Sequence, residues 1–239
     1  MTAVPERFNA ARYILAENAR RRGNKTALIV VGEAGEEHFT FAELDSEVRE
    51  LAAGFRSLGL PERARIMIRL GNEPVYVVAY LAAMAAGYIA LPSSSQLTDE
   101  EAAFLLQDSG AAALLVASAP PAGLPEGVVV LGRPEIERLV RAEPIAGYAE
   151  TAAEDPAYLV YTSGKTSRPK GVLHAHRAVW GRRPMHDAWL GLTEHDVMLH
   201  AGAMNWTYTL GVGIMDPWAR GATSAVSYTH LTLPTILRV

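Results

Sequence analysis

Residues 157–171 read Ala-Tyr-Leu-Val-Tyr-Thr-Ser-Gly-Lys-Thr-Ser-Arg-Pro-Lys-Gly, an apolar run followed by residues rich in hydroxyl, glycine and lysine. The run from Ala157 to Tyr161 predicts a buried strand, and the residues from Thr162 to Gly171 predict an exposed loop after it. The hydroxyl and backbone N–H groups of such a loop, with the cation of Lys170, can surround phosphate oxygens. Ligands of α/β sheets bind at the carboxyl ends of strands, so the stretch indicates a nucleotide-binding loop.

Two other interpretations explain these residues less well. Gly164-Lys165-Thr166 spells the end of a Walker A loop, but that loop needs a glycine where Leu159 stands. Pro169 would also stand near the start of the helix that must follow a Walker A loop. A surface loop without a ligand would not account for this string directly after an apolar strand.

Composition narrows the class of protein. The 239 residues are 49% hydrophobic, which is enough for the core of one large or two small domains. A net charge of −4 gives no electrostatic reason to expect a nucleic-acid partner. The chain has no cysteine and its charged N-terminus has no apolar signal-peptide core, so we expect a cytoplasmic protein. The histidines between residues 174 and 200 form no recognised ligand set with acidic residues, and we expect no protein-held metal.

One apolar run, from Val75 to Leu91, is a candidate for a membrane-spanning helix. It falls short of the roughly 20 residues that a span requires, and Gly87 splits it. It predicts instead a helix from Pro74 to Ala86 with a cap at Asn72, followed by a short buried strand. We therefore expect no integral membrane segment.

The rest of the chain alternates between helices and strands with short connections. Two capping boxes, Thr40 with Glu43 and Thr98 with Glu101, predict helix starts. Strands are predicted at residues 27–31, 38–41, 64–70, 88–91, 113–117, 128–131 and 197–200. The predicted fold class is α/β, with a largely parallel sheet flanked by helices.

The loop resembles the phosphate-binding signature of the adenylate-forming superfamily, Thr-Ser-Gly-Ser/Thr-Ser/Thr-Gly-x-Pro-Lys-Gly. This superfamily includes acyl-CoA synthetases, luciferases and peptide-synthetase adenylation domains. Lys165 stands where a hydroxyl residue is usual, and Ser167 stands where the second glycine is usual. Phe41-Ala42-Glu43-Leu44 and the segment from Tyr80 to Pro92 are also similar to segments that precede the loop in this family. The resemblance covers about residues 7–224.

This resemblance implies an incomplete N-terminal domain of an adenylate-forming enzyme, which acts on a carboxylic acid with ATP, Mg2+ and coenzyme A. It implies that the ATP phosphates are held by Thr162, Ser163, Gly164, Lys165, Thr166, Ser167, Lys170 and Gly171. Trp206 and Asp216-Pro217-Trp218 keep the spacing seen in acyl-CoA synthetases of the acetate and medium-chain kind. The acyl pocket is therefore expected to include Trp206 and its neighbour Asn205.

The end of the chain departs from the family. Residues 226–235 look like one reading frame of a sequencing adapter, so we expect residues 225–239 to be a non-native tail with few core contacts. Residues 1–224 would then be a partial N-terminal AMP-binding domain, without the C-terminal domain that carries the catalytic lysine. No catalytic residue is assigned here, and the fragment is expected to be inactive. The parent would be an AMP-forming acyl-CoA synthetase, with a carrier-loading adenylation domain and a non-catalytic nucleotide-binding relative as alternatives.

Overall fold

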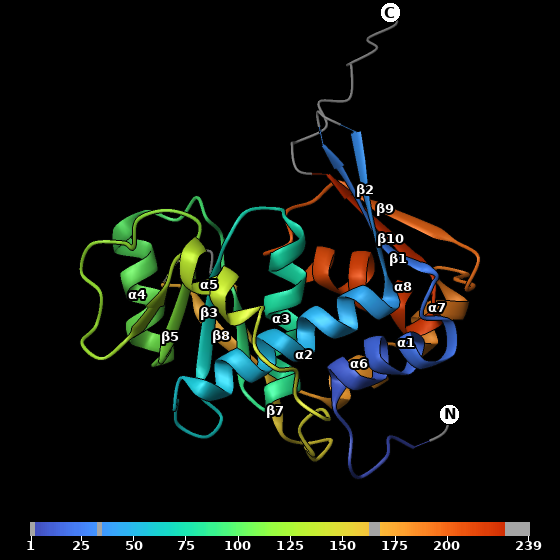
Figure 1. Cartoon of the computed structure of the whole chain (residues 1–239), viewed down its shortest axis with the longest axis horizontal. Helices are drawn as coiled ribbons and strands as arrows, with labels where there is room; N and C mark the ends of the chain where they lie inside the picture. Colours follow the sequence, from blue (N-terminus) through green and yellow to red (C-terminus); the bar gives the residue numbers. More distant parts are fainter. Residues whose placement is uncertain (1–2, 33–34, 163–167, 228–239) are drawn as a thin grey trace, which may run out of the picture.

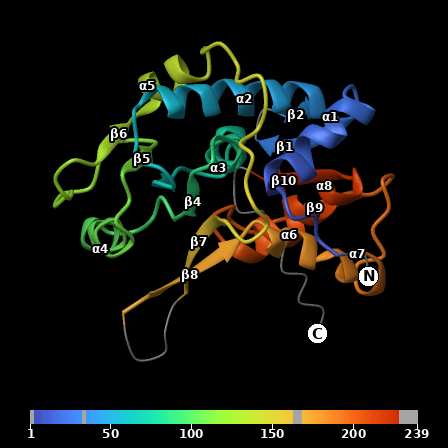
Figure 2. The same ribbon diagram turned by 90° about the horizontal axis from the view of Figure 1, so that it is seen from below.

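The structure, a computed structural model, describes residues 3–32, 35–162 and 168–227. Two sheets carry the fold, one of four strands in the order β2-β1-β10-β9 and one of six strands in the order β6-β5-β3-β4-β7-β8. Figure 2 shows α3 (Pro74–Ala86) at the centre of the molecule, between the strands of the two sheets. Every residue of α3 from Tyr76 to Ala85 is buried, which explains why this helix is apolar on all sides.

The four-stranded sheet joins the two ends of the described chain. It contains β1 (Thr26–Gly32), β2 (Gly35–Thr40), β9 (Val197–His200) and β10 (Thr223–Ser227). Strand β10 runs parallel to both β1 and β9, and β1 pairs with β2 as an antiparallel hairpin. Ala225, Val226 and Ser227 are buried in β10, so the prediction of few core contacts from Ala225 onward is wrong for these three residues. Residues 228–239 lie outside the described residues, and the proposed adapter origin stays a prediction.

The six-stranded sheet is parallel except at one edge. It contains β3 (Arg65–Arg69), β4 (Ile89–Pro92), β5 (Ala113–Val116), β6 (Val129–Leu131), β7 (Pro156–Thr162) and β8 (Lys170–Ala175). Only β8 is antiparallel, because it returns from β7 as a hairpin. The predicted α/β class with a largely parallel sheet is confirmed. Strand β8 was not predicted, because its first four residues are all exposed and show no alternation of buried and exposed positions.

Local sequence signals mark the starts of some of the helices. Besides α3 they are α1 (Glu17–Arg22), α2 (Phe41–Ser57), α4 (Asp99–Ser109), α5 (Arg133–Leu139), α6 (Arg177–Gly181), α7 (Arg183–Ala188) and α8 (Asp216–Arg220), with π-helical turns η1 (Arg12–Ala16) and η2 (Thr209–Met215). Both predicted capping boxes are present, at the starts of α2 and α4. Helix α3 ends at Gly87, whose φ of 88° suits glycine.

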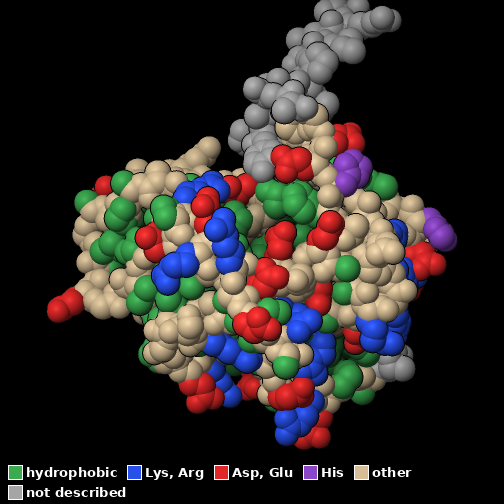
Figure 3. Space-filling view, viewed as in Figure 1, with side chains coloured by type: hydrophobic (Ala, Val, Ile, Leu, Met, Phe, Trp, Pro, Cys, Tyr) green, Lys and Arg blue, Asp and Glu red, His purple; other side chains and the backbone are tan. Residues whose placement is uncertain are grey.

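The cap predicted for α3 is wrong by one residue. Glu73, not Asn72, is the N-cap, and the Asn72 side chain instead bonds to distant backbone groups described below. Among the described residues, no helix has the length and hydropathy needed to cross a bilayer. On the face shown in Figure 3, acidic and basic side chains are interspersed, in line with the small net charge of −4.

Candidate functional site

The predicted phosphate loop is the connection of the β7–β8 hairpin. Strand β7 is buried from Ala157 to Val160 and ends at Thr162, which pairs with Lys170 at the start of β8. Lys170 and Gly171 therefore belong to a strand, and the loop is shorter than predicted. Lys170 is exposed and stands at the base of this connection. The predicted phosphate-binding residues at positions 163–167 lie outside the described residues.

Two contacts with α4 hold the base of the hairpin. The Tyr161 hydroxyl donates a hydrogen bond of 2.6 Å to Asp108 Oδ2, and the Arg168 guanidinium lies 5.3 Å from the centroid of the Phe104 ring. Burial raises the pKa of Tyr161, and the bond to Asp108 raises it further, so the hydroxyl keeps its proton. Gly171 leaves room for this arrangement, because a Cβ there would lie 3.1 Å from Leu159 Cδ1 and 3.3 Å from Tyr161 Cζ.

The carboxyl ends of the parallel strands converge beside this hairpin. Strands β3, β4 and β7 are neighbours in the six-stranded sheet and run parallel, so their carboxyl ends share one edge. In the other sheet, β9 leads into residues 201–206, and β10 ends at Ser227. The Asn72 side chain bonds to both of these segments and so joins the two edges. Such edges are where α/β sheets bind ligands.

The predicted acyl-pocket residues lie in the segment that follows β9. Trp206 is 65% exposed, and its backbone N–H donates to Ala203 O at 3.0 Å. Asn205 is half-buried, and the adjacent Met204 is fully buried. Among the described residues, one groove of about 870 Å³ lies beside α1, α6 and α7, and another of about 500 Å³ lies beside α2, α3 and α5. Neither groove is lined by Trp206 or Asn205, and their role in an acyl pocket stays a prediction.

A buried ionic network joins Asp216 to Arg182 and His186. Asp216 is 1% exposed and accepts hydrogen bonds from Arg182 Nε and Nη2, both at 2.6 Å, while His186 Nε2 lies 3.1 Å from Asp216 Oδ1. Burial alone would raise the pKa of Asp216, but the bonds from His186 and Arg182 outweigh it and lower the pKa. The network ties α7 to α8. Sequence reasoning missed it, since Asp216 was noted there only for its spacing from Trp206.

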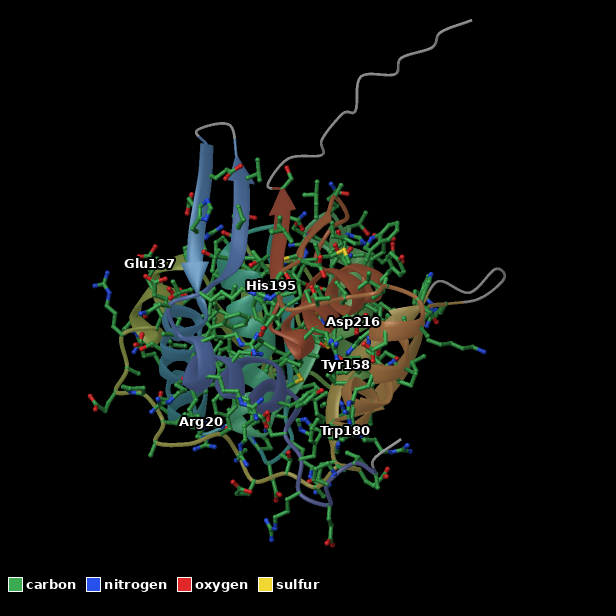
Figure 4. The ribbon with its side chains drawn as sticks, turned by 90° about the vertical axis from the view of Figure 1, so that its right-hand side faces the viewer. Arg20, Glu137, Tyr158, Trp180, His195 and Asp216 are labelled. Atoms are coloured by element: carbon green, nitrogen blue, oxygen red, sulfur yellow. The ribbon has the colours of Figure 1, made fainter. Side chains whose placement is uncertain are left out.

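The network lies close to strand β7. Figure 4 shows Asp216 and Tyr158 in the same part of the interior, and the charge of Asp216 contributes to the pKa of Tyr158. Burial raises that pKa to about 12, so Tyr158 is protonated at neutral pH. The Tyr158 ring stacks on His174 of β8, with 4.6 Å between ring centroids. Gly211 leaves space for the Arg182 guanidinium, because a Cβ at this position would lie 2.8 Å from Arg182 Nη2.

His176 has a structural role that the sequence did not reveal. It is completely buried after β8, and its Nδ1 accepts a 3.0 Å hydrogen bond from the backbone N–H of Ala10. Burial lowers its pKa from 6.5 to about 4, with a small opposing effect of Asp155. His176 is therefore neutral at pH 7. Across the described part of the chain, no group of three or more histidine, aspartate or glutamate side chains is placed to hold a metal ion.

A sequence model of the family described as "AMP-binding enzyme" matches residues 15–238. The chain belongs to this AMP-binding family. The resemblance found in the sequence is thereby confirmed, and the hairpin loop after β7 carries the residues on which it rested. The matched range extends beyond residue 224, where the predicted N-terminal domain was taken to end.

Individual proteins similar to the chain include CoA ligases and a linear gramicidin synthase subunit. A benzoate–CoA ligase of Thauera aromatica is 29% identical, over 93% of the chain and 45% of its own length. A linear gramicidin synthase of Brevibacillus parabrevis is 29% identical over 84% of the chain and 2% of its own length. The crystal structure of a benzoate CoA ligase from Burkholderia xenovorans superposes with a TM-score of 0.81 at 27% identity, covering 93% of the chain and 46% of that protein. The AMP-binding chain thus spans less than half the length of these two CoA ligases.

Proposed function

We propose that the chain is the N-terminal part of an AMP-forming acyl-CoA ligase that activates a carboxylic acid with ATP. The observation that carries this proposal is the phosphate-loop signature, placed between β7 and β8 at the carboxyl edge of a parallel sheet. The similarity to benzoate–CoA ligases over 93% of the chain favours an aromatic acid of benzoate size as the substrate. The zero cysteine content fits a reducing compartment, and we place the reaction in the cytoplasm.

The proposed reaction has two steps. The carboxylate attacks the α-phosphorus of Mg2+-bound ATP and pyrophosphate leaves; the thiol of coenzyme A then attacks the acyl-adenylate and AMP leaves. Neither step needs covalent chemistry on the protein, so its contribution is alignment and charge neutralisation. In this scheme the residues from Thr162 to Gly171 surround the β- and γ-phosphates, with Lys170 as their cation. Trp206 and Asn205 line the acid side.

A carrier-loading adenylation domain is the second candidate, favoured by the 29% identity to a linear gramicidin synthase. The two candidates share the first step and differ in the thiol that accepts the acyl group. Supplying coenzyme A or a carrier protein to the acyl-adenylate distinguishes them. We also propose that an adapter-derived tail follows the partial AMP-binding domain after the end of β10, and reading the genomic DNA past the codon of Ala225 tests this.

The test of the first step is ATP–pyrophosphate exchange by the product of the complete gene. Exchange should require an added carboxylic acid, with benzoate among the accepted acids. Lys170→Ala should weaken exchange by about 1.5–3 kcal/mol, because one charge-assisted phosphate contact is lost. Arg177→Ala is the matched control, since Arg177 is also an exposed cation but is paired with Glu154 at 2.7 Å after β8. Exchange without any acid, or equal exchange by both variants, would contradict the proposal.

A further inference from the structure

We propose that Asn72 is a positioning residue for the acid-binding side of the proposed active site. It would hold residues 201–206, which carry Asn205 and Trp206, against the edge of the sheet that carries the phosphate loop. The proposal deepens the proposed function and rests on it. Asn72 itself need not touch a substrate in this account, because it acts through the backbone of the segment that it holds.

The Asn72 side chain uses both of its polar atoms on backbone groups that are far away in sequence. Its Oδ1 accepts a 2.7 Å hydrogen bond from the N–H of Met204. Its Nδ2 donates to Gly202 O at 3.3 Å and to Ser227 O at 3.2 Å. One short side chain therefore connects the start of α3, the segment after β9 and the carboxyl end of β10.

The position of Asn72 relates this connection to the phosphate loop. Ile66 of β3, Ala90 of β4 and Tyr158 of β7 lie in register across the six-stranded sheet. Asn72 and Thr162 each follow a few residues beyond this line, at the carboxyl ends of β3 and β7. Strands that have one strand between them are about 10 Å apart. Asn72 therefore holds the segment after β9 at the same edge of the sheet as the end of β7.

The segment is also tightly fitted at Gly202, next to the Asn72 contact. A Cβ at this position would lie 2.5 Å from Thr209 Oγ1 and 2.8 Å from His200 Cε1, and the Gly202 N–H donates to His200 Nδ1 at 3.1 Å. Figure 1 shows the segment after β9 reaching the start of α3 across the top of the molecule. Loss of the Asn72 bonds should shift this segment, and Trp206 with it, without displacing the phosphate loop on β7.

Asn9 provides a matched control of the same chemistry at another place. Its Nδ2 donates to Met84 O at 2.9 Å and to Ala149 O at 3.2 Å, and its Oδ1 accepts from the N–H of Arg12 at 3.2 Å. Like Asn72, it connects distant backbone segments through three hydrogen bonds. Its partners lie near η1 and the end of α3, away from the carboxyl edges. Asn9→Ala should therefore lower stability, as Asn72→Ala does, but without the effect on the acid.

The experiment compares Asn72→Ala with Asn9→Ala in the product of the complete gene by ATP–pyrophosphate exchange. We expect Asn72→Ala to raise the KM for benzoate about tenfold, with the KM for ATP changed by less than about twofold, because only the acid side loses its hydrogen bonds. Asn9→Ala should leave both KM values within about twofold of the wild type. Asn72→Asp is a second variant of nearly the same size. It keeps the acceptor for Met204 but loses both donors, so it should also raise the KM for the acid.

Hydrogen–deuterium exchange gives a readout that does not depend on activity. The amide of Met204 should exchange at least about tenfold faster in Asn72→Ala than in the wild type, and Asn9→Ala should leave it unchanged. Equal KM values for the acid in all variants, or an equal rise for acid and ATP, would overturn the positioning role. A wild-type protein without acid-dependent exchange would instead overturn the proposed function. In that case, faster exchange of the Met204 amide in Asn72→Ala than in the wild type would show that the Asn72 contact has a purely structural role.

Discussion

His176 should make the stability of this protein depend on pH between about 6.5 and 4. The histidine is completely buried, and burial lowers its pKa from 6.5 to about 4. The unfolded chain therefore binds a proton at a higher pH than the folded chain does. Stability due to the neutral ring is present in full above pH 6.5 and is lost as the pH falls toward 4.

The size of the effect follows from the two pKa values. At about 1.4 kcal/mol per pKa unit, complete titration removes about 3.5 kcal/mol of stability. Over the practical range from pH 7 to pH 5 the expected loss is about 2 kcal/mol, since the folded state stays unprotonated while the unfolded state takes up its proton. That is a large part of the 5–15 kcal/mol roughly typical of a domain.

The assay is urea denaturation at pH 7 and pH 5, with His176→Asn as the test variant. Asparagine can still accept the bond from the N–H of Ala10 but does not titrate. Between pH 7 and pH 5, the variant should therefore lose about 2 kcal/mol less stability than the wild type. His195→Asn is the control, because the His195 side chain is 87% exposed. His174 and His200, whose pKa values burial also lowers, contribute equally to all three proteins. An equal loss in wild type and His176→Asn would show that His176 does not cause the pH dependence.

Two other predictions concern the network and the pocket. Asp216→Ala should lower the free energy of unfolding by about 3 kcal/mol in urea denaturation, because it leaves Arg182 without its buried carboxylate. Arg177→Ala, which removes the exposed Arg177–Glu154 pair, should lower it by less than about 1 kcal/mol. Similar losses would mean that the buried network does not stabilise the fold. Trp206→Ala in the product of the complete gene should shift the ratio of kcat/KM between larger acids and benzoate by about tenfold with an unchanged KM for ATP, and an unchanged ratio would remove Trp206 from the pocket.

Local sequence signals were sufficient for much of the fold. A capping box involves residues three positions apart, so Thr40 with Glu43 and Thr98 with Glu101 predicted helix starts that the structure confirms. Buried parallel strands have continuous apolar runs, and Ala157–Tyr161 is such a run within β7. Strand β8 has no such signal, because it is an edge strand whose first residues face solvent.

The features of the site that the sequence did not predict depend on partners far along the chain. Asparagine is a common helix cap, so the sequence favoured that role for Asn72. Only the tertiary structure brings Met204 and Ser227 to its side chain. Asp216 finds Arg182 and His186 because α7 and α8 pack together. At the end of β10, a resemblance in the sequence misled the prediction. Ala225–Ser227 were assigned to a tail because they lie in or beside a segment that looks like an adapter. In the structure these small residues complete a strand between β1 and β9.

The most direct test of the account is to supply the product of the complete gene with benzoate, ATP, Mg2+ and coenzyme A and to identify the products by mass spectrometry. The proposed reaction gives a benzoyl thioester of coenzyme A and an equal amount of AMP, with neither formed when the acid is left out. Release of ADP and phosphate in place of AMP, or AMP formation that does not depend on an acid in a panel of aromatic and aliphatic carboxylates, would contradict it.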